Sequence, residues 1–386
     1  MSDRFAARAA AVAEVAAAHA AEVDRDAREP AEAVVALREH GLLGASVPAA
    51  LGGEGASLRE LSGIATALGA ACASTGMVFA MHHGQAMTLW RHGGEGAGVR
   101  ALIERVRDEG ALLASSTTER GIGGDARRSS CALERPAPGR VRVVKDSPVV
   151  SYAGSADVIL ITARRDADAA ESDQRLLACP IGEILLEPRS EWDTLGLRGT
   201  VSRGYLLEAE TSESNLLADD YAAISSQTAL PVSHVLWASV WLGIAVSAAD
   251  TARSAVRAQL RGAAAAGPTP SPAALRLAEL YAALQAFADA VRHAAERFDA
   301  LADDRDALGG VSFALAMNAV KVSSADAVVD IVTRALRIVG IAGYRLDSEQ
   351  SLGRQLRDAH GAAIQISNDR LLANNAALVA MARPEL

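Results

Sequence analysis

The sequence predicts an α+β protein in which a block of short strands lies between two helical regions. Residues 4–23 repeat alanine, valine and charged residues at helical spacing, without proline or glycine. From 111 to about 210 the apolar runs become short and are bounded by turn residues, which is typical of strands. Long helical patterns return after residue 218, and two helical domains around a β domain are the simplest architecture for this order. The predicted domain boundaries are 1–110, 111–217 and 218–386.

Signals at helix ends divide the N-terminal region into further helices. Pro30 opens a second helix, because proline suits the first helical position. Ser57 is a favourable N-cap, and Glu60, three residues later, completes the pattern of a capping box. Residues 74–90 predict a buried helix and residues 97–109 an amphipathic one.

The strand block contains two small, polar loops. Strands are expected at 111–114, 141–144, 158–162, 175–178 and 205–208. The loop 115–125 is rich in hydroxyl groups and glycine, and the segment 145–156 adds the hydroxyl group of Ser151. Glycine lets a backbone approach a ligand closely, so the two loops suit a flat ligand with polar edges. From these residues alone, ordinary turns between strands are the simpler interpretation.

The C-terminal region is predicted to be entirely helical. The expected helices span 219–261, 271–303, 309–339 and 349–381. A segment rich in proline, glycine and alanine, 262–272, separates the first two. The longest apolar stretch, 235–249, is too short to cross a bilayer, so no membrane span is expected.

Composition narrows the possible partners. The formal net charge of −9 argues against nucleic acid and against an anionic membrane as partners. The three cysteines are scattered, with neither metal-ligand spacing nor a disulfide framework, so we expect no metal site and a cytoplasmic location. Basic charge is almost all arginine, because Lys145 and Lys321 are the only lysines.

Several segments, in order along the chain, resemble the acyl-CoA dehydrogenase family. Residues 36–55 resemble its N-terminal signature, and Thr118–Asp125 (TERGIGGD) resembles its loop for flavin and thioester, usually T-E-P-x-A-G-S-D. Glu191–Ser202 closely matches the second motif of the family's β domain. Gly340–Tyr344 and Leu356–Ala359 match its C-terminal pair. Together these segments cover essentially the whole chain at the family's spacing.

The resemblance implies FAD held between a central β-barrel-like domain and a C-terminal four-helix bundle. It also implies a homotetramer, built as a dimer of dimers, in which a neighbouring subunit completes the site. The implied substrate is an acyl-CoA or acyl-carrier thioester, and a flavoprotein is a possible electron acceptor. The implied FAD-binding residues are Ser115, Thr117, Thr118, Gly123, Gly124, Ser151, Arg257, Arg337, Gly340, Ile341, Asn368 and Arg370. Around Arg257, however, only the arginine of the family's Glu-Arg-x-x-Phe-Gly segment is kept.

The family's catalytic base is missing at its expected position. The family removes an α-proton with a carboxylate while hydride passes to the flavin, and an alkyl side chain cannot accept that proton. Alignment without gaps places Ile366 at the family's glutamate, and the alternative base position falls near His234, where there is no glutamate either. Asp369, brought back by a register shift, and neutral His234 are possible substitutes. An exposed charge and a core histidine are the simpler interpretations of these two residues.

Three functions therefore remain open. The leading one is flavin-dependent α,β-desaturation of an acyl thioester by an unidentified base. The second is a flavin-dependent monooxygenase of the same fold, which needs no such glutamate. The third is a non-catalytic relative of the dehydrogenases. The fold alone does not choose among them.

Overall fold

The N-terminal helices form as the end signals predict. The structure is a computed structural model, and it describes residues 3–122, 125–262, 271–380 and 382. The helices are α1 (Asp3–Asp26), α2 (Ala31–Glu39), α3 (Leu58–Ala71), α4 (Ala73–His92) and α5 (Ala97–Glu109). The capping box is confirmed, since the Ser57 hydroxyl accepts from the Glu60 N–H at 3.2 Å and the Glu60 carboxylate accepts from the Ser57 N–H at 3.1 Å.

Two three-stranded sheets follow. One has the order β1–β3–β4, with β1 (Leu113–Ser116) parallel to β3 (Val158–Arg164) and β4 (Gln174–Pro180) antiparallel to β3. The other has the order β2–β6–β5, all antiparallel. Its strands are β2 (Arg140–Val150), β6 (Arg203–Ser212) and β5 (Ile184–Pro188).

The sheet prediction needs two corrections. Strand β5 was not predicted, because it is short and lies half-exposed at the sheet edge, so its side chains lack a clear alternation. Strand β2 continues past Val144 to Val150 despite Pro148. It tolerates the proline because β2 is an edge strand and its pairing with β6 is irregular between Ser147 and Val150.

The C-terminal region is helical, but its last predicted helix is wrong. A short helix, α6 (Tyr221–Ile224), and a π-helical turn, Ser225–Ala229, lead into α7 (Leu230–Gly262). The later helices are α8 (Pro272–Ala300), α9 (Arg305–Leu308), α10 (Val311–Val339), α11 (Ile341–Tyr344), α12 (Gly353–Ala359) and α13 (Asn368–Val379). Instead of one helix over 349–381, α12 and α13 are separated by a turn at 360–367, in which Ile366 has a φ of 49°.

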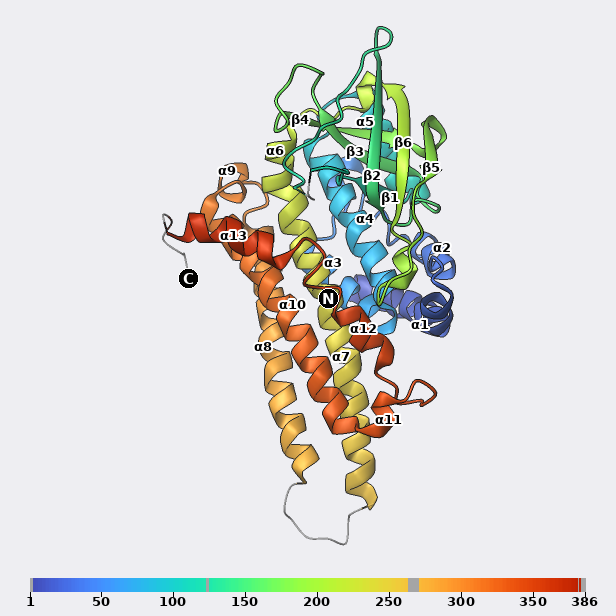
Figure 1. Cartoon of the computed structure of the whole chain (residues 1–386), viewed down its shortest axis with the longest axis vertical. Coiled ribbons are helices and arrows are strands. Elements are labelled where there is room, and N and C mark those ends of the chain that lie inside the picture. The colour runs from blue at the N-terminus through green and yellow to red at the C-terminus, as the bar shows by residue number, and fades with distance from the viewer. Residues whose placement is uncertain (1–2, 123–124, 263–270, 381, 383–386) are drawn as a thin grey trace.

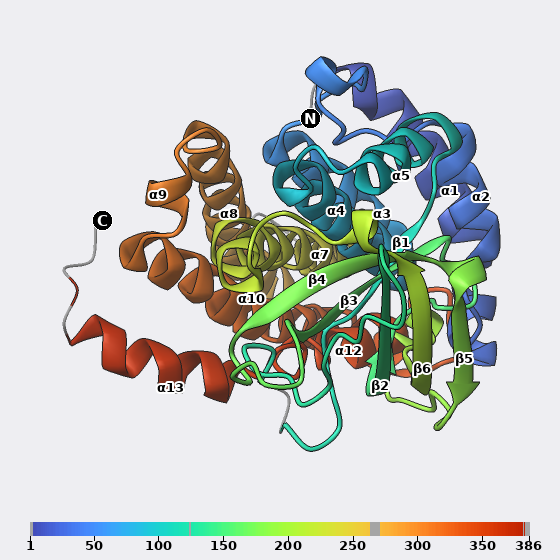
Figure 2. The ribbon, with the colours of Figure 1, turned by 90° about the horizontal axis from the view of Figure 1, so that it is seen from above.

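Figure 1 shows α7, α8 and α10 side by side below the sheets, with α13 directed away from them, and Figure 2 shows the same arrangement from above. This arrangement, helices before and after small sheets, confirms the predicted fold class.

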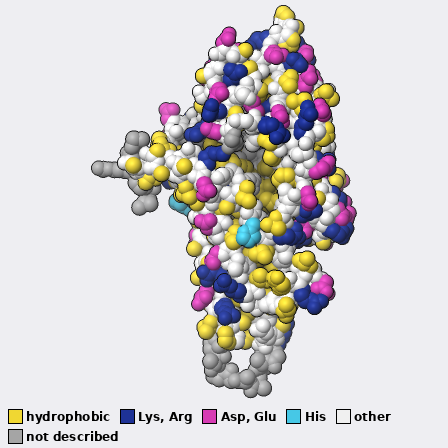
Figure 3. Space-filling view, in the orientation of Figure 1, with side chains coloured by type: hydrophobic (Ala, Val, Ile, Leu, Met, Phe, Trp, Pro, Cys, Tyr) yellow, Lys and Arg dark blue, Asp and Glu magenta, His cyan; other side chains and the backbone are white. Residues whose placement is uncertain are grey.

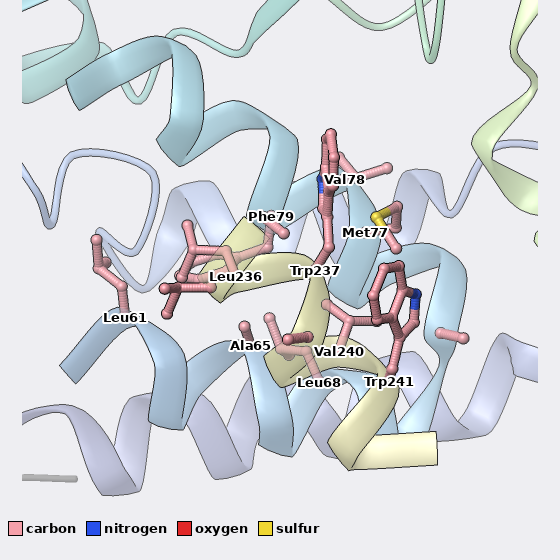
Figure 4. Packing of buried hydrophobic residues seen from close by; sticks show 14 of the residues in the cluster. Leu61, Ala65, Leu68, Met77, Val78, Phe79, Leu236, Trp237, Val240 and Trp241 are labelled. Carbon is pink, nitrogen blue, oxygen red and sulfur yellow. The ribbon is translucent and has the colours of Figure 1, made fainter. Parts of the chain in front are cut away.

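Helix α7 is the central element of the helical core. The segment Tyr221–Arg261 is long and apolar enough to cross a membrane, but 83% of its apolar window is buried inside the protein, as in a core helix. Figure 4 shows its apolar side chains packed against those of α3 and α4. A Cβ atom at Gly69 would lie 2.5 Å from the Val240 carbonyl oxygen, and one at Gly243 would collide with the Thr66 carbonyl. Glycine is therefore required where α3 and α7 meet.

Two buried histidines attach α4 to its neighbours. The Leu113 N–H donates to His82 Nδ1 at 3.0 Å, so Nε2 carries the proton and donates to the Leu43 carbonyl at 2.7 Å. His83 Nε2 lies 2.9 Å from the Leu42 carbonyl. Burial lowers the pKa of His82 to about 4 and that of His83 well below its usual value. Both therefore stay neutral, and they hold the start of β1 and the turn after α2 against α4.

We expect the protein to become less stable as pH falls from 7 to 5, because His82 takes up a proton only in the unfolded chain. Its pKa is about 4 in the folded protein and 6.5 when unfolded, so between these values only the unfolded chain takes up the proton. The free energy of unfolding should lose about 2 kcal/mol from this residue between pH 7 and pH 5. Urea unfolding of wild type and His82→Gln at both pH values checks this, because the variant should lack that share of the pH dependence.

Two features make this comparison specific. Burial raises the pKa of Asp358 to about 6, which favours the folded state as pH falls, but this contribution is common to both proteins. His293→Gln, a change at an exposed histidine on α8, is the matched control and should keep the wild-type pH dependence. Equal pH dependence in wild type and His82→Gln would contradict the assignment.

Candidate functional site

The two predicted loops form one continuous wall in the structure. The Ser116 and Ser147 hydroxyls lie 2.5 Å apart and join β1 to β2. Thr118 donates to the Val149 carbonyl at 3.2 Å. Ser115, Thr117 and Thr118 remain partly accessible while Ser116 is buried. These three residues keep some exposed surface, and their predicted contact with a flat ligand stays a prediction.

Ser151 lies in the same wall but already has a partner. Its hydroxyl lies 2.8 Å from that of Ser202, which in turn lies 2.8 Å from the hydroxyl of Thr200. Ser151 is half-buried, and its predicted contact with the flavin stays a prediction. The motif Glu191–Ser202 thus contacts the wall through the Ser202 hydroxyl group, and the sequence did not predict this contact.

The buried carboxylate of Glu119 holds together the two ends of the loop 119–131. Glu119 is only 5% exposed and accepts hydrogen bonds from the hydroxyl groups of Ser129 and Ser130 and from the N–H groups of Ser130 and Cys131. Burial alone would raise the pKa of Glu119, but the hydrogen bonds from Ser130 and Ser129 and the charge of Lys145 outweigh it and lower the pKa. The ionised carboxylate therefore closes the loop 119–131. Sequence analysis did not identify this role.

Asp125, in the described part of the loop, lies near helix α13. Gly123 and Gly124 lie outside the described residues, so their predicted contact with the flavin stays a prediction. Next to them, hydrogen bonds from Arg127 lower the pKa of Asp125, and the charge of Arg370 adds to the effect. Arg370 on α13 therefore lies near Asp125, while its predicted contact with the flavin stays a prediction. Figure 3 shows the face hollowed between the sheets and the C-terminal helices, with hydrophobic side chains inside the hollow.

The turn between α12 and α13 forms the opposite wall. Ile366, at the family's base position, is half-buried, and its side chain packs against the hydrophobic core. Its carbonyl accepts a hydrogen bond from Lys321 Nζ at 2.6 Å, and Asn368 Oδ1 accepts another at 2.7 Å. Asp369 is exposed in the first turn of α13, and because Ile366 is not helical, the expected offset between these two residues does not hold. The register shift that would make Asp369 a base is therefore not present.

His234 is fully buried on α7. Among the described residues, neither ring nitrogen has a well-aligned hydrogen-bond partner. Burial lowers the pKa of His234 to about 3, the charge of Lys321 adds to this, and the backbone of Met317 opposes it weakly. The ring is neutral at physiological pH. A base this weak is poorly suited to removing a proton from carbon.

His234 lies near a set of polar groups on α7 and α10, namely Trp237, Trp241 and Lys321, which we call the seam. Trp237 and Trp241 lie on the same face of α7, and Lys321 Nζ lies 5.7 Å from the Trp241 ring. In the turn after α12, Gln365 Nε2 lies 3.2 Å from Met77 Sδ on α4. Within the described chain, the buried atoms without a hydrogen-bond partner include both indole N–H groups and Gln365 Oε1. Unpaired buried polar atoms are rare, and they indicate a place for water or a ligand.

The remaining predicted residues lie away from this wall. Arg257 is exposed on α7, beside a groove of about 510 Å³ between α7 and α8. Arg337, Gly340 and Ile341 are exposed where α10 meets α11, at the end of the helices remote from the sheets (Figure 1). Within one chain these residues do not join the others. Their predicted role requires a neighbouring subunit and stays a prediction.

Comparisons with known proteins agree with this architecture. Residues 4–106 match the family model described as acyl-CoA dehydrogenase, N-terminal domain, and residues 224–365 match acyl-CoA dehydrogenase, C-terminal domain. Amino sugar nitrososynthase DnmZ of Streptomyces peucetius is 28% identical, over 87% of this chain and 82% of that protein. Cyclohex-1-ene-1-carbonyl-CoA dehydrogenase of Geobacter metallireducens is 25% identical, over 88% of this chain and 87% of that protein.

A solved structure shows the same fold with ligands present. The structure of KijD3 in complex with FMN and dTDP-3-amino-2,3,6-trideoxy-4-keto-3-methyl-D-glucose has a TM-score of 0.79 and 25% sequence identity. The match covers 100% of this chain and 94% of that one. These similarities support a flavoprotein oxidoreductase.

Glu119→Gln tests the support of the flavin loop. The amide presents N–H groups to partners that are themselves donors, so the buried hydrogen bonds cannot all be kept. We expect the free energy of unfolding to fall by about 1–3 kcal/mol. Flavin affinity should fall roughly 10-fold as the loop loosens, which is about 1.4 kcal/mol. Urea unfolding and fluorescence titration with flavin measure the two effects.

Glu134→Gln is the matched control, because Glu134 forms an exposed ion pair with Arg142 in the same domain. Such pairs contribute little, so both measurements should stay near wild type. An unchanged flavin affinity in a destabilised Glu119→Gln protein would mean that Glu119 supports the fold but not the binding loop.

Proposed function

The chain belongs to the acyl-CoA dehydrogenase family, and within it we propose a flavin-dependent monooxygenase that oxidises the amine nitrogen of a nucleotide-linked amino sugar. The overall reaction consumes the amine, O2 and reduced flavin. It produces a hydroxylamine, water and oxidised flavin. Two electrons from the flavin balance the reaction, and a separate reductase would supply them.

One observation carries this proposal, namely the lack of a competent base among the described residues at the family's two base positions. Ile366 has no acid, and His234 is buried with a pKa of about 3. Asp369, the remaining substitute, is exposed in α13. Desaturation requires a group that accepts a proton from carbon, whereas oxygen transfer to nitrogen uses the lone pair of the substrate amine and needs no such group.

The residues of the two walls fit a flavin. Ser115, Thr117 and Thr118 offer accessible hydroxyl groups for the polar edges of the ring, and Ser151 adds a fourth. Reduced flavin, when bound, supplies the electrons with which O2 is divided between the substrate and water. The chain's own contribution is to orient the ring on the β-domain wall and to limit the access of water with the apolar side chain of Ile366.

The relatives support the choice of substrate class and of flavin. DnmZ is named an amino sugar nitrososynthase, and the KijD3 complex contains FMN and a dTDP-linked amino sugar. We therefore propose FMN, although the resemblance alone implied FAD. The loss of most of the family motif around Arg257, a segment whose arginine reaches the neighbouring subunit's FAD in the family, also weakens the case for FAD.

Oxygen transfer is the decisive test. Purified protein with reduced FMN, isotope-labelled O2 and a panel of nucleotide-linked amino sugars should yield a product that carries labelled oxygen on nitrogen. Mass spectrometry detects the label, and unlabelled O2 is the control. If the panel gives no labelled product while an acyl-CoA bleaches the protein-bound flavin without oxygen, the chain is a desaturase, which its similarity to a CoA dehydrogenase also allows.

Flavin identity can be tested separately. Titration of the flavin-free protein should show tighter binding of FMN than of FAD, because the proposed site holds the ring and first phosphate within one chain. We expect a preference of roughly 10-fold, which corresponds to about 1.4 kcal/mol. Tighter binding of FAD would contradict the cofactor assignment, and binding of neither flavin would support a non-catalytic relative.

A further inference from the structure

We infer that Lys321 on α10 is a positioning residue, which fixes the turn between α12 and α13 and thereby holds Ile366 against the flavin site. The inference rests on the proposed function, because the turn gains a catalytic role only if a flavin lies opposite it. The geometry of Lys321 itself does not depend on that proposal.

The first step is the pair of hydrogen bonds that Lys321 makes. The side chain is fully buried, and Nζ donates to the Ile366 carbonyl at 2.6 Å and to Asn368 Oδ1 at 2.7 Å. Both acceptors belong to the junction of the turn and α13. Hydrogen bonds from a charged donor are about twice as strong as those between neutral groups. One side chain from α10 therefore holds two points of the turn.

The second step is the conformation that these bonds hold. Ile366 has a φ of 49°, which is unfavourable for a β-branched residue. Backbone hydrogen bonds within the turn and packing of the Ile366 side chain on the core support this conformation. The backbone of the turn is held by the Asn368 N–H, which donates to the Ala363 carbonyl at 3.0 Å, and the Ser367 hydroxyl caps α13. Lys321 adds the contact that fixes the Ile366 carbonyl.

The third step is the cost of placing a lysine at this position. A buried ammonium group loses its hydration, whereas an apolar side chain of similar length would fill the same space without that penalty. Most other buried positions of α10, such as Met317 and Val328, are apolar, and Ser324 is the buried polar residue nearest to Lys321 on this helix. Charge at position 321 is therefore best explained by what it binds, which is the turn.

The groups around Lys321 determine its response to pH. His234 and Trp241 face it from α7, and Asp326 lies on its own helix. Burial lowers the pKa of Lys321 to about 8, and the charge of Asp326 opposes this only partly. The ammonium group is present below pH 8 and is lost as pH rises through that value. Its hold on the turn should weaken over the same range.

Amide hydrogen exchange on the full-length, flavin-free protein tests the inference. In Lys321→Met, protection of the Asn368 and Arg370 amides should fall roughly 10- to 100-fold at pH 7, which is the range expected for lost bonds to a charged donor. Lys321→Arg keeps the charge and should retain protection within a few-fold. In wild type, the same amides should lose protection between pH 7 and 9, whereas amides of the sheets should not.

Asn318→Ala is the matched control on the same helix. Asn318 Nδ2 donates to Asn375 Oδ1 at 2.8 Å, so this change loosens the later turns of α13 but leaves the turn at 360–367 in place. Wild-type protection of the turn in Lys321→Met would overturn the inference. Equal loss of protection throughout α10 would also overturn it, because Lys321 would then only pack the core. If Lys321→Met does not fold, wild type provides the test. Unchanged protection of the Asn368 and Arg370 amides between pH 7 and 9 would then overturn the inference.

Turnover separates this inference from the proposed function. If wild type transfers oxygen, Lys321→Met should lower kcat by roughly 10-fold or more with KM for the amine little changed, and Lys321→Arg should restore most of it. If wild type transfers no oxygen but the exchange results are as expected, the proposed function fails while the positioning role stands. If wild type transfers oxygen, and Lys321→Met and Lys321→Arg both match it in amide hydrogen exchange and in kcat, the positioning role fails while the proposed function stands.

Discussion

The close approach of α7 to α3 is the constraint on which the rest of the molecule depends. It is possible only because Gly69 and Gly243 have no side chains, so backbone meets backbone at this crossing. With α7 fixed there, its opposite face, which carries His234, Trp237 and Trp241, is directed to α10 and to the turn before α13. The glycines thus determine the location of the polar seam without contributing any chemistry. Loss of this packing would displace one wall of the site relative to the other.

The two walls are held by different forces. On the β-domain wall, a buried anion gathers donors, since Glu119 accepts from hydroxyl and N–H groups of the loop that it closes. On the helical wall, a buried cation gathers acceptors, since Lys321 donates to a carbonyl and to an amide oxygen. In both places a single buried charge orders a segment without regular structure. A charge can do so because, in a medium of low polarity, each of its hydrogen bonds is stronger than in water.

Local signals explain why much of the fold could be predicted. The helix 97–109 and the capping box at Ser57 depend on neighbours within one or two turns, and the structure has them as expected. The break between α12 and α13 could not be predicted, because Ile366 adopts its strained backbone through contact with Lys321, 45 residues earlier in the chain. The hydroxyl-rich loop was predicted from its motif. The roles of Glu119 and Lys321 were not, because they depend on partners that only the fold brings near. The sole sequence signal was that one of two lysines lies in an apolar helix.

The composition of the seam also bears on the kind of reaction it could assist. Among the described residues its two indole N–H groups lack a hydrogen-bond partner, Lys321 donates to the turn, and its one histidine is too weak a base to hold a proton at neutral pH. A site that removes a proton from carbon needs an acceptor with a pKa near the working pH. Replacement of the family's carboxylate by Ile366 is therefore accompanied by surroundings that also lack a competent base, which the proposed oxygen transfer does not need.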